Sequence, residues 1–351
     1  MVSMFIVPLK NHKKRLNMDN NKNIASYFLG IPTINNQKDL ANHLNLSEYS
    51  LYKIINFTDW HYKRVQTPKK DGTFRNLACP SQTIKAVQAW ILRNILDPLS
   101  VSPSATAFKK ETTIKFNVER HSDNQFFLCL DISNFFESIP QKKVTSFFKA
   151  LGYNKHVASI LSTLCTYEGS LPQGGVTSPA LSNLINTKLD KRISGYCSRK
   201  NIVYSRYADD FTFSSNNPSK LIQAKNIIKK IINDEGYQIN KKKTRFIRPG
   251  NSKKITGLVI SDDNKIGIGR KQKRILRAKI HQYFLNDQLT PPEKEKLKNH
   301  IEGWISYLKG IDYYYFKQIQ KWQQEFSQKA KKEKSKKAAE KKEFQELLRS
   351  F

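Results

Sequence analysis

The chain has 351 residues, of which 38% are hydrophobic, and this length and composition predict a folded protein with two or three subdomains. No apolar run approaches the roughly 18 residues that span a bilayer, and residues 1–8 are too short for a signal-peptide core, so we expect a cytoplasmic protein with no membrane segment. The formal net charge of +32 attracts a polyanion, and nucleic acid is favoured over a membrane surface because the N-terminus offers neither a basic amphipathic helix nor a lipidation signal.

The predicted elements begin after a polar, basic start. The first 20 or so residues are rich in Asn and Lys, which predicts a poorly ordered segment. From Thr83 the apolar residues recur at helical spacing until Asp97-Pro98 ends the helix. Residues 126–132 form an apolar run interrupted only by Asp131, which predicts a strand, and helices follow it up to about Leu164.

A helix and a hairpin are predicted next. Ser178 resembles an N-cap with proline in the first helical turn, and the helix runs toward Tyr196. Residues 202–207 and 211–214 are strand-like and are joined by a tight turn that carries Asp209-Asp210. A helix over about 218–236 and short strands near Phe246 and at 255–260 complete this region.

The C-terminal part is helical. Three helical stretches between Arg270 and about Gln328 predict a separate subdomain, in which Trp304 and Trp322 are favoured as core residues. Residues 329–351 alternate Lys with Ala and Glu, which is typical of a solvated helix or of a disordered basic arm.

Three carboxylates in the middle of the chain carry the chemistry. Strand, helix, hairpin, helix, strand is the order of a split βαβ sheet, which brings Asp131 near Asp209 and Asp210. Carboxylates in apolar strands are costly to bury without a cation, and converging oxygen ligands suit Mg²⁺. Two such ions support nucleotidyl transfer. Taken alone, an Asp-Asp pair at a hairpin tip is more often turn chemistry.

The motifs around these carboxylates resemble those of reverse transcriptases. Residues 130–136 read LDISNFF, residues 171–179 read LPQGGVTSP and residues 207–210 read YADD. The resemblance spans roughly residues 50–310 and implies an α+β, right-hand polymerase fold. Its parts would be an N-terminal extension (1–49), fingers (50–125), a ferredoxin-like palm (126–262, with fingers helices inserted at about 140–170), a helical thumb (263–328) and a Lys-rich tail (329–351).

The same resemblance implies roles for individual residues. Two Mg²⁺ ions would be held by Asp131, Asp209, Asp210 and the backbone carbonyl of Ile132. The residues implied to bind the incoming dNTP are Lys69, Arg75, Phe136, Gln173 and Lys243. Among them Phe136 would be the steric gate against a 2′-hydroxyl, Gln173 would contact the nucleotide and its template base, and Lys243 would protonate pyrophosphate. Arg75 would grip the triphosphate together with Lys69, which spacing does not distinguish from Lys70.

Two further segments resemble the bacterial retron branch. Residues 117–121 (NVERH) are similar to an NAxxH signature, with Val118 in place of its alanine, and residues 255–257 (ITG) are similar to a VTG signature. The residues implied to bind RNA are Asn117, His121, Thr256, Gly257, Lys271, Arg274 and Arg277. The resemblance implies a cognate structured noncoding RNA, priming from a guanosine 2′-hydroxyl, a branched RNA–DNA product, a role in antiphage defence and an effector or toxin protein as partner.

Alternatives remain open at this stage. The pair Asn117 and His121 is also consistent with two polar residues at helical spacing, and Thr256-Gly257 with a strand bulge. The chain is compatible with a group II intron-like or other bacterial reverse transcriptase, or with an RNA-binding scaffold that sequesters an effector. The four cysteines lie far apart and form no CxxC pair, so we expect reduced, mostly structural thiols.

Overall fold

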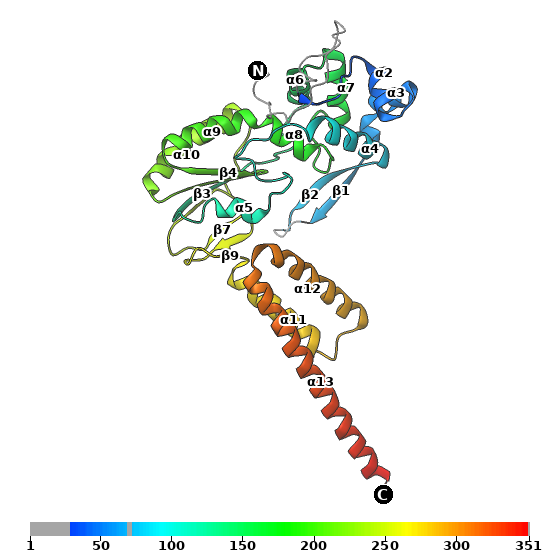
Figure 1. Ribbon diagram of the computed structural model, residues 1–351, viewed down its shortest axis with the longest axis vertical. Coiled ribbons are helices and arrows are strands. Elements are labelled where there is room, and N and C mark those ends of the chain that lie inside the picture. Colours follow the sequence, from blue (N-terminus) through cyan, green and yellow to red (C-terminus); the bar gives the residue numbers. More distant parts are fainter. Residues whose placement is uncertain (1–28, 69–71, 350–351) are drawn as a thin grey trace, which may run out of the picture. The chain divides into compact units, whose positions relative to one another are not determined.

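The computed structural model describes residues 29–68 and 72–349 (Figure 1). The chain divides between Pro249 and Gly250 into two compact units. The predicted palm segment 250–262 therefore belongs to the second unit. The predictions for the first 20 residues, Lys69 and Lys70 lie outside the described residues.

The first unit is built around a four-stranded antiparallel sheet with the order β4-β5-β3-β6. The strands are β3 (Phe126–Asp131), β4 (Val203–Tyr207), β5 (Asp210–Ser215) and β6 (Arg245–Ile247). Helix α10 (Pro218–Asp234) packs on β3 and β5, and α9 (Thr187–Arg199) packs on β4 (Figure 1). This is the strand adjacency that the split βαβ order predicts.

The sequence explains why the sheet is central. Every residue of β3 after Phe126 is buried, so its continuous apolar run suits a strand covered on both faces. Helix α10 buries Leu221, Ala224, Ile228 and Ile232, which recur every three or four residues and form one apolar stripe. The sheet and this stripe belong to one hydrophobic cluster.

Helices and a β-hairpin complete the first unit. They are α2 (Gln37–Leu44), α3 (Glu48–Asn56), the 3₁₀-helix η2 (Thr58–His61), β1 (Tyr62–Pro68), β2 (Phe74–Pro80), α4 (Gln82–Ile91), the π-helix η3 (Leu92–Leu96), α5 (Ile114–Glu119), α6 (Gln141–Ala150), α7 (Lys155–Cys165) and α8 (Ser178–Ile185). Leu40 and Ala41 in α2 are buried in the shared core. Part of the segment predicted as an N-terminal extension (1–49) therefore packs in the core of the first unit.

One predicted helix is divided in two. Helix α8 begins at Ser178 itself, with Thr177 as its N-cap residue, so Ser178 is not the N-cap. The backbone leaves helical geometry at Asn186, and α9 begins at Thr187. The Asn186 side chain accepts a hydrogen bond from the Tyr237 hydroxyl at 2.7 Å, a contact from a distant segment that local sequence does not reveal.

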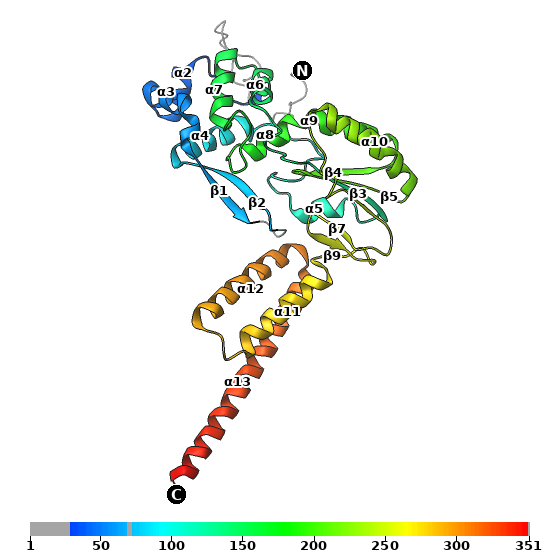
Figure 2. The same ribbon diagram turned by 180° about the vertical axis from the view of Figure 1, so that it is seen from behind.

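The second unit contains a small sheet and three helices (Figure 2). Its elements are β7 (Lys253–Ile255), β8 (Leu258–Ile260), β9 (Ile266–Gly267), α11 (Gly269–Leu285), α12 (Pro291–Ile311) and α13 (Tyr313–Arg349). The helices bury Leu276, Ile280, Ile301, Leu308 and Ile319. Helix α13 continues through the Lys-rich tail up to Arg349, so the helical form of the two predicted alternatives is the one observed.

No helix within residues 29–68 and 72–349 is long and apolar enough to cross a bilayer. All four cysteines have free thiols: Cys129, Cys165 and Cys197 are buried, and Cys79 is exposed.

Candidate active site

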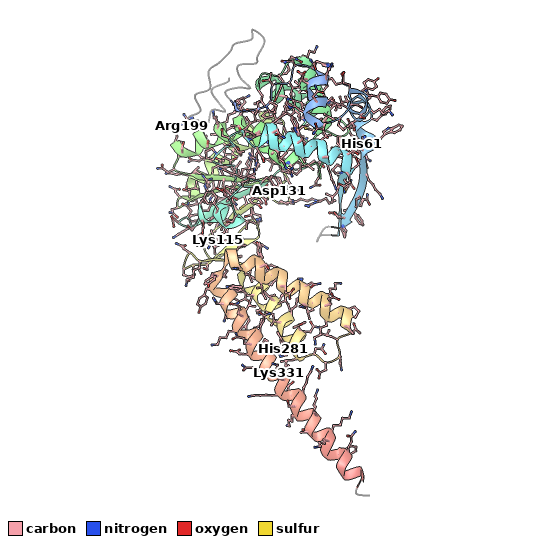
Figure 3. The ribbon with its side chains drawn as sticks, turned by 45° about the vertical axis from the view of Figure 1, so that its right-hand side comes forward. His61, Lys115, Asp131, Arg199, His281 and Lys331 are labelled. Carbon is pink, nitrogen blue, oxygen red and sulfur yellow. The ribbon has the colours of Figure 1, made fainter. Side chains whose placement is uncertain are left out.

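The sheet register places the three carboxylates together. Asp131, labelled in Figure 3, lies at the end of β3 and pairs with Asp210 at the start of β5. Tyr207 pairs with Asp210, so Ala208 and Asp209 form a two-residue hairpin turn between β4 and β5. The Ile132 amide donates to the Asp209 carbonyl at 3.1 Å, which fixes the chain after β3 against this turn. In an extended strand the N–H and C=O of one residue point to the same side, so the Ile132 carbonyl also faces the turn.

The carboxylates destabilise one another's charged forms. Burial, followed by the negative charges of Asp209 and Asp131, raises the pKa of Asp210 to about 6. Burial also raises the pKa of Asp209, and the charge of Asp131 adds to this shift. The fields of Lys243, Arg75 and Arg245 oppose these shifts. The site therefore concentrates negative charge that a bound cation would stabilise.

Lys243 supplies one positive charge. Its Nζ lies 2.8 Å from Oδ2 of Asp131, and this hydrogen bond is the largest cause of the raised pKa of Lys243. The loop that carries Lys243 is anchored because the Asn240 amide donates to the Asp131 carbonyl at 2.8 Å. Asn240 in turn accepts hydrogen bonds from the Lys243 and Thr244 amides. Backbone contacts thus hold Lys243 beside Asp131.

The donor set suits a hard divalent ion. Within the described ranges, no three His, Cys, Asp or Glu side chains are grouped so that they alone could hold a metal ion. The residues available are carboxylates and the Ile132 carbonyl, which are the oxygen ligands that Mg²⁺ prefers. Their mutual repulsion, partly offset by the Lys243 ammonium, is the electrostatic condition that a divalent cation relieves.

A buried polar network supports the hairpin turn, and the sequence analysis missed it. Arg206 and Asp190 are both fully buried and form a bidentate ion pair, with N–O distances of 2.8 and 2.7 Å. The same guanidinium donates to Asn183 at 3.2 Å and, more weakly, to the Ala208 carbonyl at 3.4 Å. The Tyr204 hydroxyl donates to Asp190 at 2.8 Å. A charged residue inside an apolar strand was the available signal, but its partner lies on another element.

The turn itself has an unusual backbone. Ala208 has φ 57°, in the left-handed region that glycine adopts more readily than alanine. Tight hairpin turns require such a residue, and glycine is the common choice. Surrounding structure must therefore hold Ala208 in place, and Arg206 is one group that contacts it.

The loop that carries Gln173 is fixed to the fingers. The Ala78 amide in β2 donates to the Gln173 carbonyl at 2.9 Å. A Cβ on Gly174 would lie 2.6 Å from the Ala78 carbonyl oxygen, and Gly174 has φ 129°, so only glycine fits there. The fully buried Gln88 accepts from the Val176 amide at 2.9 Å and donates to the Leu164 carbonyl at 2.8 Å. Sequence reasoning singled out Gln173 but missed Gln88.

Two further predicted nucleotide contacts, Phe136 and Arg75, lie among the described residues. Phe136 is half-buried, and its ring lies 5.3 Å from that of Phe135 and 6.3 Å from that of Phe108. Arg75 on β2 is exposed, and its charge acts on Asp209. Lys69 lies outside the described residues.

Two predicted RNA contacts are corrected by the structure. Asn117 and His121 are fully buried, so neither side chain can contact RNA directly. The two His121 nitrogens lie 2.7 Å from the Ser214 hydroxyl and 2.8 Å from the Ser205 hydroxyl, and burial lowers the pKa of His121 to about 3. Asn117 accepts from the Thr106 hydroxyl at 2.8 Å. His121 is neutral because burial of a charged imidazole would be costly. Its two hydrogen bonds connect Ser205 on β4 with Ser214 on β5.

The predicted RNA contacts in the second unit are more exposed than Asn117 and His121. Thr256 (φ 45°) and Gly257 (φ 94°) form the two-residue turn between β7 and β8, so this segment is a hairpin turn and not a bulge. Gly257 is exposed, as are the α11 cations Lys271, Arg274 and Arg277. These residues are accessible to a ligand, and their RNA contacts remain predictions.

Aromatic residues in this unit pack against its cations. Arg277 lies over the Trp322 ring at 4.8 Å. Trp304 and Trp322 are only half-buried, so the prediction of core positions holds in part. Lys273 forms an ion pair with Asp312 at 2.8 Å, which gives it a structural partner.

Comparisons with known proteins identify the family. The sequence profile described as "Reverse transcriptase (RNA-dependent DNA polymerase)" matches residues 67–277. The chain is 40% identical over 287 residues to the retron Ec86 reverse transcriptase of Escherichia coli, covering 81% of this chain and 87% of that protein. It is 29% identical over 334 residues to the retron Mx65 reverse transcriptase of Myxococcus xanthus, covering 88% and 76%. A Candida albicans telomerase structure matches with a TM-score of 0.44 and 12% identity, over 77% of this chain and 60% of that chain. The chain belongs to the reverse transcriptase family, with the right-hand polymerase fold, and is an RNA-directed DNA polymerase of the retron type.

Proposed function

We propose that this polymerase copies part of a cognate structured noncoding RNA into a branched RNA–DNA molecule, primed from a guanosine 2′-hydroxyl, and acts in antiphage defence. The observation that carries the catalytic part is the register of Asp131 with Asp210 beside the Asp209 turn. The similarity to proteins named as retron reverse transcriptases supports the retron part.

In this proposal Asp131, Asp209, Asp210 and the Ile132 carbonyl hold two Mg²⁺ ions. When bound, these ions supply Lewis-acid activation of the attacking hydroxyl and charge stabilisation of the leaving pyrophosphate. Lys243, already hydrogen-bonded to Asp131, donates a proton to the leaving pyrophosphate oxygen.

In the same proposal, residues of the neighbouring elements bind the incoming dNTP. Gln173, held by its backbone bond to Ala78, contacts the incoming dNTP and its template base. Phe136 lies under the sugar and excludes a 2′-hydroxyl. Arg75 grips the triphosphate through its guanidinium fork, and Lys69 assists it.

RNA recognition is assigned to the second unit. The exposed cations Lys271, Arg274 and Arg277 on α11 contact RNA phosphates, and the turn of half-buried Thr256 and exposed Gly257 adds a further contact. The remaining partners are the RNA–DNA product and an effector or toxin protein.

The experiment that tests this proposal compares the wild-type enzyme with the isosteric double variant Asp209→Asn, Asp210→Asn. Nucleic acid extracted from the purified wild-type protein should contain DNA that resists RNase and is shortened by a debranching enzyme, and the variant should contain none. Linear DNA alone would favour another type of bacterial reverse transcriptase. RNA without DNA, combined with no Mg²⁺-dependent dNTP incorporation, would leave the RNA-binding scaffold as the better account.

A further inference from the structure

A groove lies on the first unit outside the site described above. Its volume is about 270 Å³, and it is formed where the end of α10 faces the segment that follows it. The residues that line it are Lys229, Asn233, Gln238, Ile239 and Lys241. Two of these are cations, two carry side-chain amides that can donate hydrogen bonds, and none is acidic.

The acidic residues at this end of α10 are engaged by other cations. Arg192 lies 2.9 Å from Asp234 and 2.7 Å from Glu235, and Lys188 lies 3.5 Å from Glu235. In the part of the chain that the structure describes, neither Lys229 nor Lys241 forms an ion pair with a carboxylate. The groove therefore presents positive charge and hydrogen-bond donors that no carboxylate of the described residues neutralises by an ion pair.

The groove is distinct from the surroundings of the catalytic carboxylates. Lys243 and Arg75 lower the pKa of Asp209, and Lys243 and Arg245 lower that of Asp210. Lys243 points to Asp131, whereas Lys241 lines the groove. Two of the three lysines in this loop, Lys241 and Lys243, are thus presented to different places.

We propose that this groove binds the phosphodiester backbone of RNA, which gives the enzyme an RNA-binding surface separate from the α11 cations. A net charge of +32 draws a polyanion to the protein, and neutralised phosphates release counterions, a gain that a single small anion in an open groove does not provide. Lysine ammonium groups and amide N–H groups are donors that contact phosphate oxygens without reading sequence. The inference rests on the proposed RNA-copying function.

The groove also bears on the active site. The loop from Asn240 to Thr244 is bonded to the Asp131 backbone, and it carries both Lys241 and Lys243. RNA held at Lys241 therefore contacts the same short loop that positions the proposed proton donor.

The test measures the salt dependence of RNA affinity. A fluorescein-labelled RNA hairpin is titrated with the full chain by anisotropy, between about 50 and about 300 mM KCl. The variant Lys229→Gln, Lys241→Gln should reduce the slope of log affinity against log salt by about 2, one unit for each lysine. The charge-retaining variant Lys229→Arg, Lys241→Arg should keep the wild-type slope. The matched control Lys149→Gln, Lys200→Gln removes two exposed lysines outside the groove and should change the slope by less than about 0.5.

Two outcomes overturn the proposal. One is an unchanged slope in the Gln variant, or a loss as large in the control. The other is calorimetric binding of inorganic phosphate that the Gln variant abolishes without any change in the RNA slope, which would assign the groove to a free anion. Wild-type dNTP incorporation on a primed RNA template is measured on the same preparation. An active enzyme with an unchanged slope defeats the groove alone, whereas an inactive wild-type enzyme defeats the proposed polymerase function.

Discussion

The buried ion pair between Arg206 and Asp190 provides a quantitative test of how the catalytic turn is supported. Asp190→Asn keeps the shape of the side chain but leaves a fully buried guanidinium without its carboxylate. Removal of one partner of a buried ion pair costs about 3 to 5 kcal/mol. We therefore expect this variant to lose about that much of its free energy of unfolding in urea denaturation monitored by circular dichroism.

A double variant separates the cost of the unpaired charge from the loss of the pair's other contacts. In Asp190→Leu, Arg206→Met both charges are removed, so the desolvation cost of an unpaired charge disappears. The Tyr204 hydroxyl then loses its acceptor, which costs about 1 to 3 kcal/mol. The double variant should thus be more stable than Asp190→Asn but less stable than the wild type. The rate of dNTP incorporation by the double variant should be lower than that of the wild type, because the Ala208 carbonyl has lost its guanidinium donor.

Two results would refute this reasoning. A loss below about 1 kcal/mol for Asp190→Asn would mean that the guanidinium reaches solvent or another acceptor. Full polymerase activity in the double variant would mean that the turn at Ala208 holds its conformation without Arg206.

Three further predictions concern the active site. Burial and nearby carboxylates raise the pKa of Asp210 to about 6, so the stability that its protonated form contributes is present below about pH 4 and is lost as pH rises through 6. In EDTA, the melting temperature of the wild type minus that of Asp210→Asn should therefore decrease between these two pH values. A difference that does not change with pH would contradict the raised pKa. Phe136→Ala should reduce the preference for dNTP over rNTP by about 10- to 100-fold in single-nucleotide incorporation, whereas the core substitution Phe148→Leu, whose ring partners are Phe147 and Tyr153, should leave it unchanged. Lys243→Met should lower kcat by about 100-fold with a smaller change in KM, and an equal loss in the exposed-loop control Lys242→Met would point to loop packing instead.

The parts of the fold that the sequence predicts well are those fixed by local pattern. The apolar run of β3 and the short strands on either side of Asp209-Asp210 indicate the sheet, and their order brings Asp131 to the hairpin. The boundary at Pro249 and the interruption at Asn186 depend on contacts between distant segments, and neither was predicted.

The prediction for His121 was wrong for a related reason. A polar pair at helical spacing looks the same whether it faces solvent or a buried hydroxyl, and only the packing of α5 near β4 decides between the two. Once Ser205 and Ser214 occupy both ring nitrogens, His121 has no remaining donor or acceptor for RNA. Gln88 was missed in the same way, because its partners at Val176 and Leu164 are far away in sequence.

The buried polar groups also explain why a repulsive site can exist in a folded chain. Asp209 and Asp210 have raised pKa values because burial and neighbouring charge disfavour ionisation, and a flexible hairpin would separate the carboxylates to relieve that repulsion. Arg206 bonds the turn from within the core, and His121 joins β4 to β5 behind it. These contacts limit separation of the carboxylates in the absence of metal. Folding therefore already supplies the free energy that holds the carboxylates close together. Binding of a divalent cation is then favoured because it relieves their mutual repulsion. On this argument, substitutions that loosen the Arg206 network should raise the Mg²⁺ concentration needed for half-maximal activity more than they raise KM for dNTP.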